Sequence, residues 1–184
     1  IHRSSPVQLG TSSWTFVTAD PNNITMAINP AGSLYVWGYG TFGGLGIPDQ
    51  QSRSSPVQLG NPSYTWNDIS AGVNFSVGLR GDNLLFTWGI NNSGQLGDLN
   101  AGTTSRSSPI QIGSSSWTQI SAGGTHTVAI RSDRSLWGWG LNTSGQLGTN
   151  DYFTRSSPVQ ISSSSWSLIS AGNTHTTAIT SDYK

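Results

Sequence analysis

The chain of 184 residues has no cysteine, no glutamate, a single lysine and few charges of either sign, 9% in all. Without cysteine it can form neither disulfides nor thiolate zinc sites, so packing and hydrogen bonding must stabilise the fold. No apolar run approaches the roughly 20 residues of a membrane-spanning helix, and we expect no membrane insertion. Polarity comes instead from Ser, Thr, Asn and Gln, which favours an extracellular, cell-surface or virion-surface location.

Positive charge is scarce as well, because eight Lys and Arg balance eight Asp and the formal net charge is zero. A protein that neutralises phosphates needs a concentrated basic face. Four of the eight basic residues are instead evenly spaced arginines. We therefore expect no nucleic-acid partner and interpret these arginines as repeated ion-pair or carbonyl contacts. Anion binding by a ring of them is the alternative.

Repetition is the dominant feature that the sequence does contain. The tetrapeptide Arg-Ser-Ser-Pro begins at four positions about 50 residues apart: Arg3, Arg53, Arg106 and Arg155. It divides the chain into three units and an incomplete fourth: 3–52, 53–105, 106–154 and 155–184. Repeats of about 40–50 residues that contain several β segments are typical of β-propellers, and we expect each unit to build one blade.

Each unit contains short segments rich in Val, Ile, Thr and aromatic residues, separated by Ser, Gly, Asn and Pro clusters. The third unit shows four of them: 109–112, 117–123, 126–130 and 136–141. This pattern predicts strands joined by tight turns, and no stretch has a convincing helical period. We expect an all-β fold of three full four-stranded repeats and a partial fourth.

Seven of the eight tryptophans recur at two positions of the repeat. The first position holds Trp14, Trp66, Trp117 and Trp166, and the second holds Trp37, Trp88 and Trp139. An indole buries a large apolar area while its N–H bonds a loop carbonyl, so we interpret both positions as packing between blades. A stacking platform for a sugar or base is the alternative. Gly97 and Gly148 end tight loops in which we expect positive-φ glycines.

The segments Trp88–Gly97 and Trp139–Gly148 both read Trp-Gly-x-Asn-x-Ser-Gly-Gln-Leu-Gly. Together with the later Ala-Gly-x-x-His, this pattern resembles the repeats of the regulator of chromosome condensation family, over essentially the whole chain. The resemblance implies a seven-bladed propeller, for which three and a half units are too few. We expect the ring to be completed by further repeats of a longer chain or by a second copy of this one.

No group of residues predicts a catalytic, metal or cofactor site. His126 and His175 share one repeat position, but that position holds Phe75 in the second unit and Ile24 in the first. A position that accepts such different side chains is a packing position, and we expect its histidine to bond a neighbouring turn. We therefore expect no enzymatic activity and no cofactor.

Differences between the units concentrate in the connection that follows each Trp-Gly segment. In repeat proteins, unit-specific loops map to one face, which is often the binding face. The candidate contacts for a protein partner are Asp49, Asp98, Leu99, Tyr152 and Phe153. Drift in unconstrained loops is the alternative.

These observations predict a non-enzymatic structural or protein-interaction propeller, within a larger secreted, cell-surface or virus-particle protein. Two alternatives follow from the resemblance. One is a secreted enzyme-inhibitor propeller that uses aromatic residues on loop tips. The other is guanine-nucleotide exchange with chromatin binding, which requires a wedge insertion and a basic surface that the sequence does not show.

Overall fold

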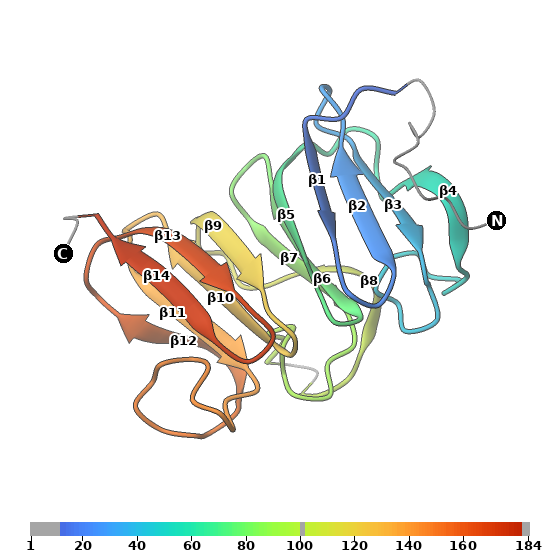
Figure 1. The fold of residues 1–184 in the computed structure, drawn as a ribbon. Helices are drawn as coiled ribbons and strands as arrows, with labels where there is room; N and C mark the ends of the chain where they lie inside the picture. Colours follow the sequence, from blue (N-terminus) through green and yellow to red (C-terminus); the bar gives the residue numbers. More distant parts are fainter. Residues whose placement is uncertain (1–11, 100–101, 182–184) are drawn as a thin grey trace, which may run out of the picture.

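The computed structural model describes residues 12–99 and 102–181, and all helical or strand structure within them is β-strand. The strands form four antiparallel sheets, here called blades 1 to 4, which follow one another around an arc (Figure 1). Blade 1 contains β1 (Phe16–Ala19), β2 (Ile24–Ile28), β3 (Leu34–Gly38) and β4 (Arg53–Gln58). Blade 2 contains β5 (Trp66–Gly72), β6 (Phe75–Arg80), β7 (Leu85–Gly89) and β8 (Arg106–Gln111). Blade 3 contains β9 (Trp117–Ala122), β10 (His126–Arg131), β11 (Leu136–Gly140) and β12 (Arg155–Ser162). Blade 4 contains β13 (Trp166–Ala171) and β14 (Thr176–Thr180). The predicted all-β propeller architecture is confirmed.

The blades are offset by one strand from the sequence units. The strands that begin at Arg53, Arg106 and Arg155 pair with β3, β7 and β11 of the preceding unit. Each four-stranded blade therefore takes three strands from one unit and its outer strand from the next. The expectation that one unit builds one blade is corrected accordingly, because the hydrogen bonds cross the unit boundary.

The hydrophobic core lies between the blades. Ile24 and Val36 of blade 1 pack with Trp66 and Trp88 of blade 2 in one cluster. A second cluster joins blade 2 to blade 3 in the same way. A third, smaller cluster joins blades 3 and 4 through four buried hydrophobic residues. Since β6 and β10 are covered on both faces, five of the six residues in each are buried, as expected for central strands.

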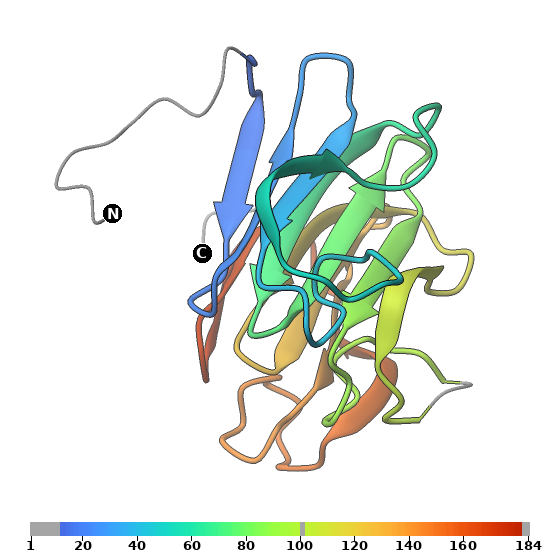
Figure 2. The same cartoon turned by 90° about the vertical axis from the view of Figure 1, so that its right-hand side faces the viewer.

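The first strands of successive blades lie side by side, and Figure 2 views the stack from the side of blade 1. The Ala122 N–H donates to Ser70 Oγ at 2.9 Å, and the Ala171 N–H donates to Ser121 Oγ at 2.9 Å. At their ends the glycines allow close approach, since a Cβ on Gly72 would lie 2.5 Å from the Gly123 carbonyl oxygen. The small residues of the repeat thus permit the crowding near the propeller axis.

Candidate functional site

The loops between the third and fourth strands are held by an ion pair in each of blades 1, 2 and 3. Asp49 binds Arg53 at 2.6 Å, Asp98 binds Arg106 at 2.5 Å, and Asp151 binds Arg155 at 2.7 Å. The three described arginines of the Arg-Ser-Ser-Pro strands thus make the ion pairs that the sequence predicted, while Arg3 lies outside the described residues. Two candidate contacts, Asp49 and Asp98, have their carboxylates engaged within their own loops.

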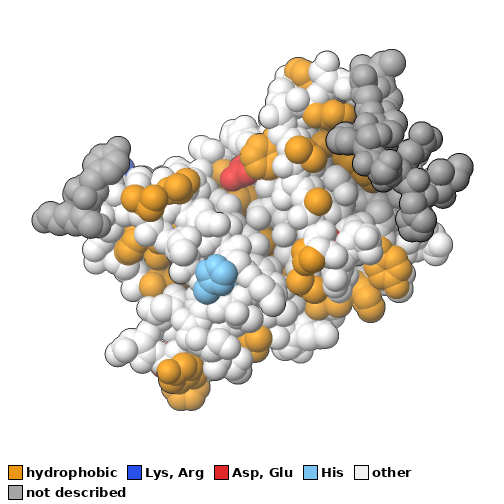
Figure 3. All heavy atoms as spheres, viewed as in Figure 1, with side chains coloured by type: hydrophobic (Ala, Val, Ile, Leu, Met, Phe, Trp, Pro, Cys, Tyr) orange, Lys and Arg blue, Asp and Glu red, His pale blue; other side chains and the backbone are white. Residues whose placement is uncertain are grey.

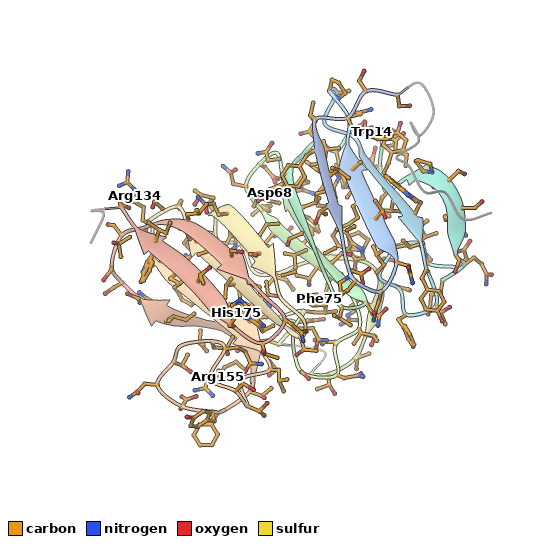
Figure 4. The ribbon with its side chains drawn as sticks, in the orientation of Figure 1. Trp14, Asp68, Phe75, Arg134, Arg155 and His175 are labelled. Atoms are coloured by element: carbon orange, nitrogen blue, oxygen red, sulfur yellow. The ribbon has the colours of Figure 1, made fainter. Side chains whose placement is uncertain are left out.

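The apolar candidates on these loops are the most exposed large hydrophobic side chains of the described residues. Leu99, Tyr152 and Phe153 are 73%, 72% and 71% exposed. Two contacts stabilise Phe153. Its backbone N–H donates to Asp151 Oδ1 at 3.0 Å, and the Arg155 guanidinium lies 5.8 Å from the centre of its ring. Arg155 marks this loop at the lower edge of Figure 4. The loop therefore presents the rings of Tyr152 and Phe153 to solvent.

A buried asparagine organises the same loop from inside. Asn142 Oδ1 accepts the Leu147 N–H at 2.9 Å, and its Nδ2 donates to Thr149 and Asp151. Asn91 has the equivalent place in blade 2 and accepts the Leu96 N–H. Both asparagines are fully buried, so their role is to shape the loops rather than to contact a partner.

Trp88 and Trp139, which begin the Trp-Gly segments of blades 2 and 3, each insert into a slot formed by the loop after the third strand of the preceding blade. The Trp88 Nε1–H donates to the Gly44 carbonyl at 2.9 Å, and the Trp139 Nε1–H donates to the Gln95 carbonyl at 2.9 Å. Both indoles are fully buried. Gly46 and Gly97 border these slots with positive φ, and a Cβ on either would lie within 3.0 Å of the indole. Each loop thus receives one tryptophan from the next blade.

The third loop faces an open groove instead of an indole. The groove has a volume of about 500 Å³ and is lined by Gln146, Leu147 and Gly148 of blade 3 and by Trp166, Thr176 and Ala178 of blade 4. Gly148 has a φ of 70°, like its counterparts, but the nearest atom to a Cβ there would be Ile161 Cγ2, 3.9 Å away. Within the described residues, blade 4 has only β13 and β14, and the tryptophan-bearing strand has no counterpart in it.

The remaining repeated tryptophans lie against the same interfaces. Trp66 and Trp117 are buried. Their ring centres lie about 6 Å from those of Trp88 and Trp139, respectively. Trp14 packs on Tyr35 and Trp37 of blade 1, with ring centres 5.3 and 6.1 Å apart. Trp37 and Trp166 are half-buried, in keeping with their places on the two end blades.

The histidine position serves packing between blades 3 and 4. His126 is fully buried, and its Nε2 lies 3.0 Å from the Thr176 hydroxyl of the next blade. The prediction that it would bond a neighbouring turn was wrong, because its partner is the first residue of β14. Burial lowers the pKa of His126 to about 4, and the nearby His175 contributes in the same direction. His175 itself is exposed on the β13–β14 hairpin (Figure 4).

A second pocket lies between the outer parts of blades 2 and 3, and the sequence analysis did not identify it. It has a volume of about 280 Å³ and is lined by Leu99, Ile112, Trp117, Arg131 and Trp137, among others. A comparison of the units could have indicated the pocket, since Ser115 on its rim stands where the preceding unit has Tyr64. A small residue in place of a large one opens the surface between the blades.

No group of three or more His, Cys, Asp or Glu that could hold a metal ion occurs among the described residues. The same part of the chain contains no helix long and apolar enough to cross a membrane. Asp68, on β5 in Figure 4, is partly buried, and desolvation raises its pKa. The face in Figure 3 carries few charged side chains, in line with the composition.

Comparisons with known proteins agree with the repeat pattern. The model of the regulator of chromosome condensation (RCC1) repeat matches residues 31–79, 82–130 and 133–179. The ultraviolet-B receptor UVR8 of Arabidopsis thaliana is 32% identical over 129 residues, which are 69% of this chain and 29% of the receptor. The probable E3 ubiquitin-protein ligase HERC6 of Homo sapiens is 35% identical over 132 residues, which are 67% of this chain and 12% of the ligase.

Solved structures show the same fold at low sequence identity. Human WBSCR16 superposes with a TM-score of 0.85 at 21% identity, over 99% of this chain and 49% of that one. Prp20p of Saccharomyces cerevisiae, studied together with its binding to Gsp1p and histones, superposes with a TM-score of 0.79 at 18% identity, over 90% and 43%. The chain thus spans about half or less of the length of these proteins and less than a third of the curated relatives named above.

Proposed function

Because the chain belongs to the regulator of chromosome condensation (RCC1) repeat family, we propose that it acts as a non-enzymatic structural and protein-interaction segment of a β-propeller. Its ring is completed by a further tryptophan-bearing strand on blade 4. That strand comes from additional repeats of a longer chain or from a second copy. The family supports an interaction role, and the open groove on blade 4 supports the completion step.

The groove is the observation that carries this proposal. Blades 1 and 2 each receive an indole whose N–H bonds a loop carbonyl, at Gly44 and Gln95. Blade 3 presents the same loop, with Gln146 and Gly148 in the equivalent places, toward the groove. A strand that pairs with β14 as β11 pairs with β10 would bring its tryptophan into this groove. Filling it would bury apolar surface that the two-stranded blade leaves open.

The partner surface that we propose is the set of loops after the third strands. Tyr152, Phe153 and Leu99 offer exposed apolar area on loops that buried asparagines hold in place. Aromatic side chains of this kind are enriched at protein interfaces. We propose a protein partner rather than nucleic acid, since Arg53, Arg106 and Arg155 are already paired with aspartates. The low charge content supports placement on an extracellular, cell or virion surface.

The test is the mass of the 184-residue chain in solution, measured by light scattering at several concentrations, with circular dichroism as a check of folding. A synthetic peptide copying residues 135–148 supplies the missing type of strand, and a Trp139→Ala version of the peptide is the matched control. We expect either a folded dimer or a monomer whose melting temperature rises with the first peptide only. A stable monomer that responds to neither peptide would contradict the proposal.

A further inference from the structure

Arg80 of blade 2 and Arg131 of blade 3 occupy equivalent positions but make different contacts. In blade 2, the Arg80 guanidinium lies between the rings of Tyr64 and Phe86, 4.9 and 4.8 Å from their centres. Its Nε and Nη2 donate to both carboxylate oxygens of Asp82, at 2.6 to 3.1 Å. Arg80 is therefore satisfied on its faces by aromatic rings and on its edge by a carboxylate.

Arg131 in blade 3 keeps only one of these three contacts. Its guanidinium lies 5.0 Å from the centre of the Trp137 ring, which replaces Phe86. Ser115 replaces the covering tyrosine and cannot reach across the guanidinium. Among the described residues, no carboxylate forms an ion pair with the Arg131 guanidinium, although Asp133 is near enough to feel its charge.

The carboxylate that would pair with Arg131 has another partner. Asp133 corresponds to Asp82, but it accepts the Ser135 N–H at 3.0 Å and the Ser135 O–H at 2.5 Å. These bonds are the main cause of the lowered pKa of Asp133, to which the charge of Arg131 adds, whereas the bond from Arg80 is the main cause for Asp82. Ser135 stands where the preceding unit has Leu84, and its hydroxyl also accepts the Trp137 Nε1–H. Ser135 therefore binds the aspartate that would otherwise pair with Arg131, and it also holds the Trp137 indole in place.

The result is an apolar pocket with a free cationic group at its edge. The pocket of about 280 Å³ has Trp117, Ile112 and Trp137 among its lining residues, and the first two are buried. Arg131 supplies the positive charge, and no described carboxylate forms an ion pair with it. Asp98 also lines it, but its carboxylate is bound to Arg106. Leu99 completes the pocket wall and is highly exposed.

We propose that this pocket binds an exposed segment of a protein partner in which an aromatic side chain lies beside an Asp or Glu. Blade 2 provides the template, since Tyr64 and Asp82 occupy the equivalent places around Arg80. The ring would cover the Arg131 guanidinium, as Tyr64 covers Arg80, and the carboxylate would bond its edge. The inference rests on the proposed interaction role and names the chemistry of one partner, but it does not depend on the completion of blade 4.

The test uses the peptide acetyl-Ser-Gly-Tyr-Asp-Gly-Ser-amide, whose blocked ends leave the aspartate as its only charge. Binding is followed by NMR through the indole N–H signals of Trp117 and Trp137 in the 184-residue chain. We expect saturable shifts of both signals. Replacement of the peptide aspartate by asparagine, or Arg131→Gln in the protein, should weaken binding about tenfold or more, because a charge-assisted hydrogen bond is lost.

Two further variants separate binding from folding. Ser115→Tyr leaves Arg131 in place but rebuilds the cover seen in blade 2, and it should abolish peptide binding. Arg80→Gln is the matched control and should leave peptide binding unchanged. The inference is overturned if millimolar peptide causes no saturable shift, or if neither Arg131→Gln nor Ser115→Tyr weakens the shift. Stabilisation by the strand peptide of residues 135–148 would persist in that case, so the two failures are distinguishable.

Discussion

Single positions in this protein keep one place in the fold while their chemistry changes between repeats. Phe75 and His126 occupy equivalent buried sites at the starts of β6 and β10. The phenyl ring needs only apolar neighbours, whereas the imidazole must remain uncharged in the same kind of space. His126 thus carries a pH dependence that Phe75 at the equivalent position lacks.

We expect the free energy of unfolding to fall as the pH drops from about 6.5 to about 4. The unfolded chain binds a proton at His126 with the ordinary pKa of 6.5, while the folded protein does so only near pH 4. Protonation therefore favours the unfolded state, by on the order of 3 kcal/mol at pH 4. Urea titrations at several pH values measure this change.

The matched variant is His126→Phe, which copies the residue of the preceding repeat. It should remove most of the decrease between pH 6.5 and 4 and leave the decrease below pH 4, where aspartates such as Asp49 and Asp151 are protonated. Their pKa values are lowered by hydrogen bonds to the backbone and to arginine, so their contribution is lost at lower pH. An unchanged slope in the variant would show that His126 is not the group that titrates.

At the scale of elements, the loop between the third and fourth strands is held by two kinds of contact in blades 2 and 3. In blade 3, the buried Asn142 amide bonds Leu147, Thr149 and Asp151, while Asp151 and Arg155 form a half-exposed ion pair. Buried polar bonds and exposed ion pairs differ in energy by several fold. The loop conformation should therefore depend on the asparagine more than on the ion pair.

We expect Asn142→Ala to destabilise the fold by roughly 2–4 kcal/mol, because buried backbone and hydroxyl partners lose their bonds. Arg155→Ala, in the same loop, should cost no more than about 1 kcal/mol, since an ion pair that water still reaches contributes little. Chemical unfolding monitored by tryptophan fluorescence compares the two variants. Equal losses would mean that the ion pair, and not the buried amide, determines the loop.

At the scale of the whole molecule, the arc becomes less tightly packed toward blade 4. The cluster between blades 3 and 4 has four buried hydrophobic residues, whereas the clusters between the earlier blades are larger. Leu168 and Ile179 on blade 4 are 53% and 49% exposed. Because a propeller blade is stabilised by its neighbours on both sides, we expect blade 4 to gain most from the proposed completion.

Hydrogen exchange of backbone amides should reveal this gradient. We expect amides of β13 and β14 to exchange at least roughly tenfold faster than those of β6 and β7, because fewer buried contacts oppose local opening. The peptide of residues 135–148 should slow exchange in β14 and leave β6 unchanged. Similar protection in all four blades would contradict a weakened blade 4.

The sequence by itself determined the period, the all-β class and the positions that pack between blades. Strict repetition of Trp-Gly and Gly-Gln-Leu-Gly places Trp88 and Trp139 in equivalent environments, and β-rich segments between turn residues have few other solutions. The arginines of the Arg-Ser-Ser-Pro strands were also interpretable as ion pairs. These are local or periodic features, and one linear chain is enough to recognise them.

Only the tertiary structure decided how the units share strands and which side chains meet across blades. The pairing of β4 with β3 crosses a unit boundary, which the period alone does not specify. The bond between His126 and Thr176 and the diversion of Asp133 from Arg131 to Ser135 depend on distances between side chains. A repeat pattern records which residues are equivalent, but contacts between neighbouring blades arise from packing in three dimensions.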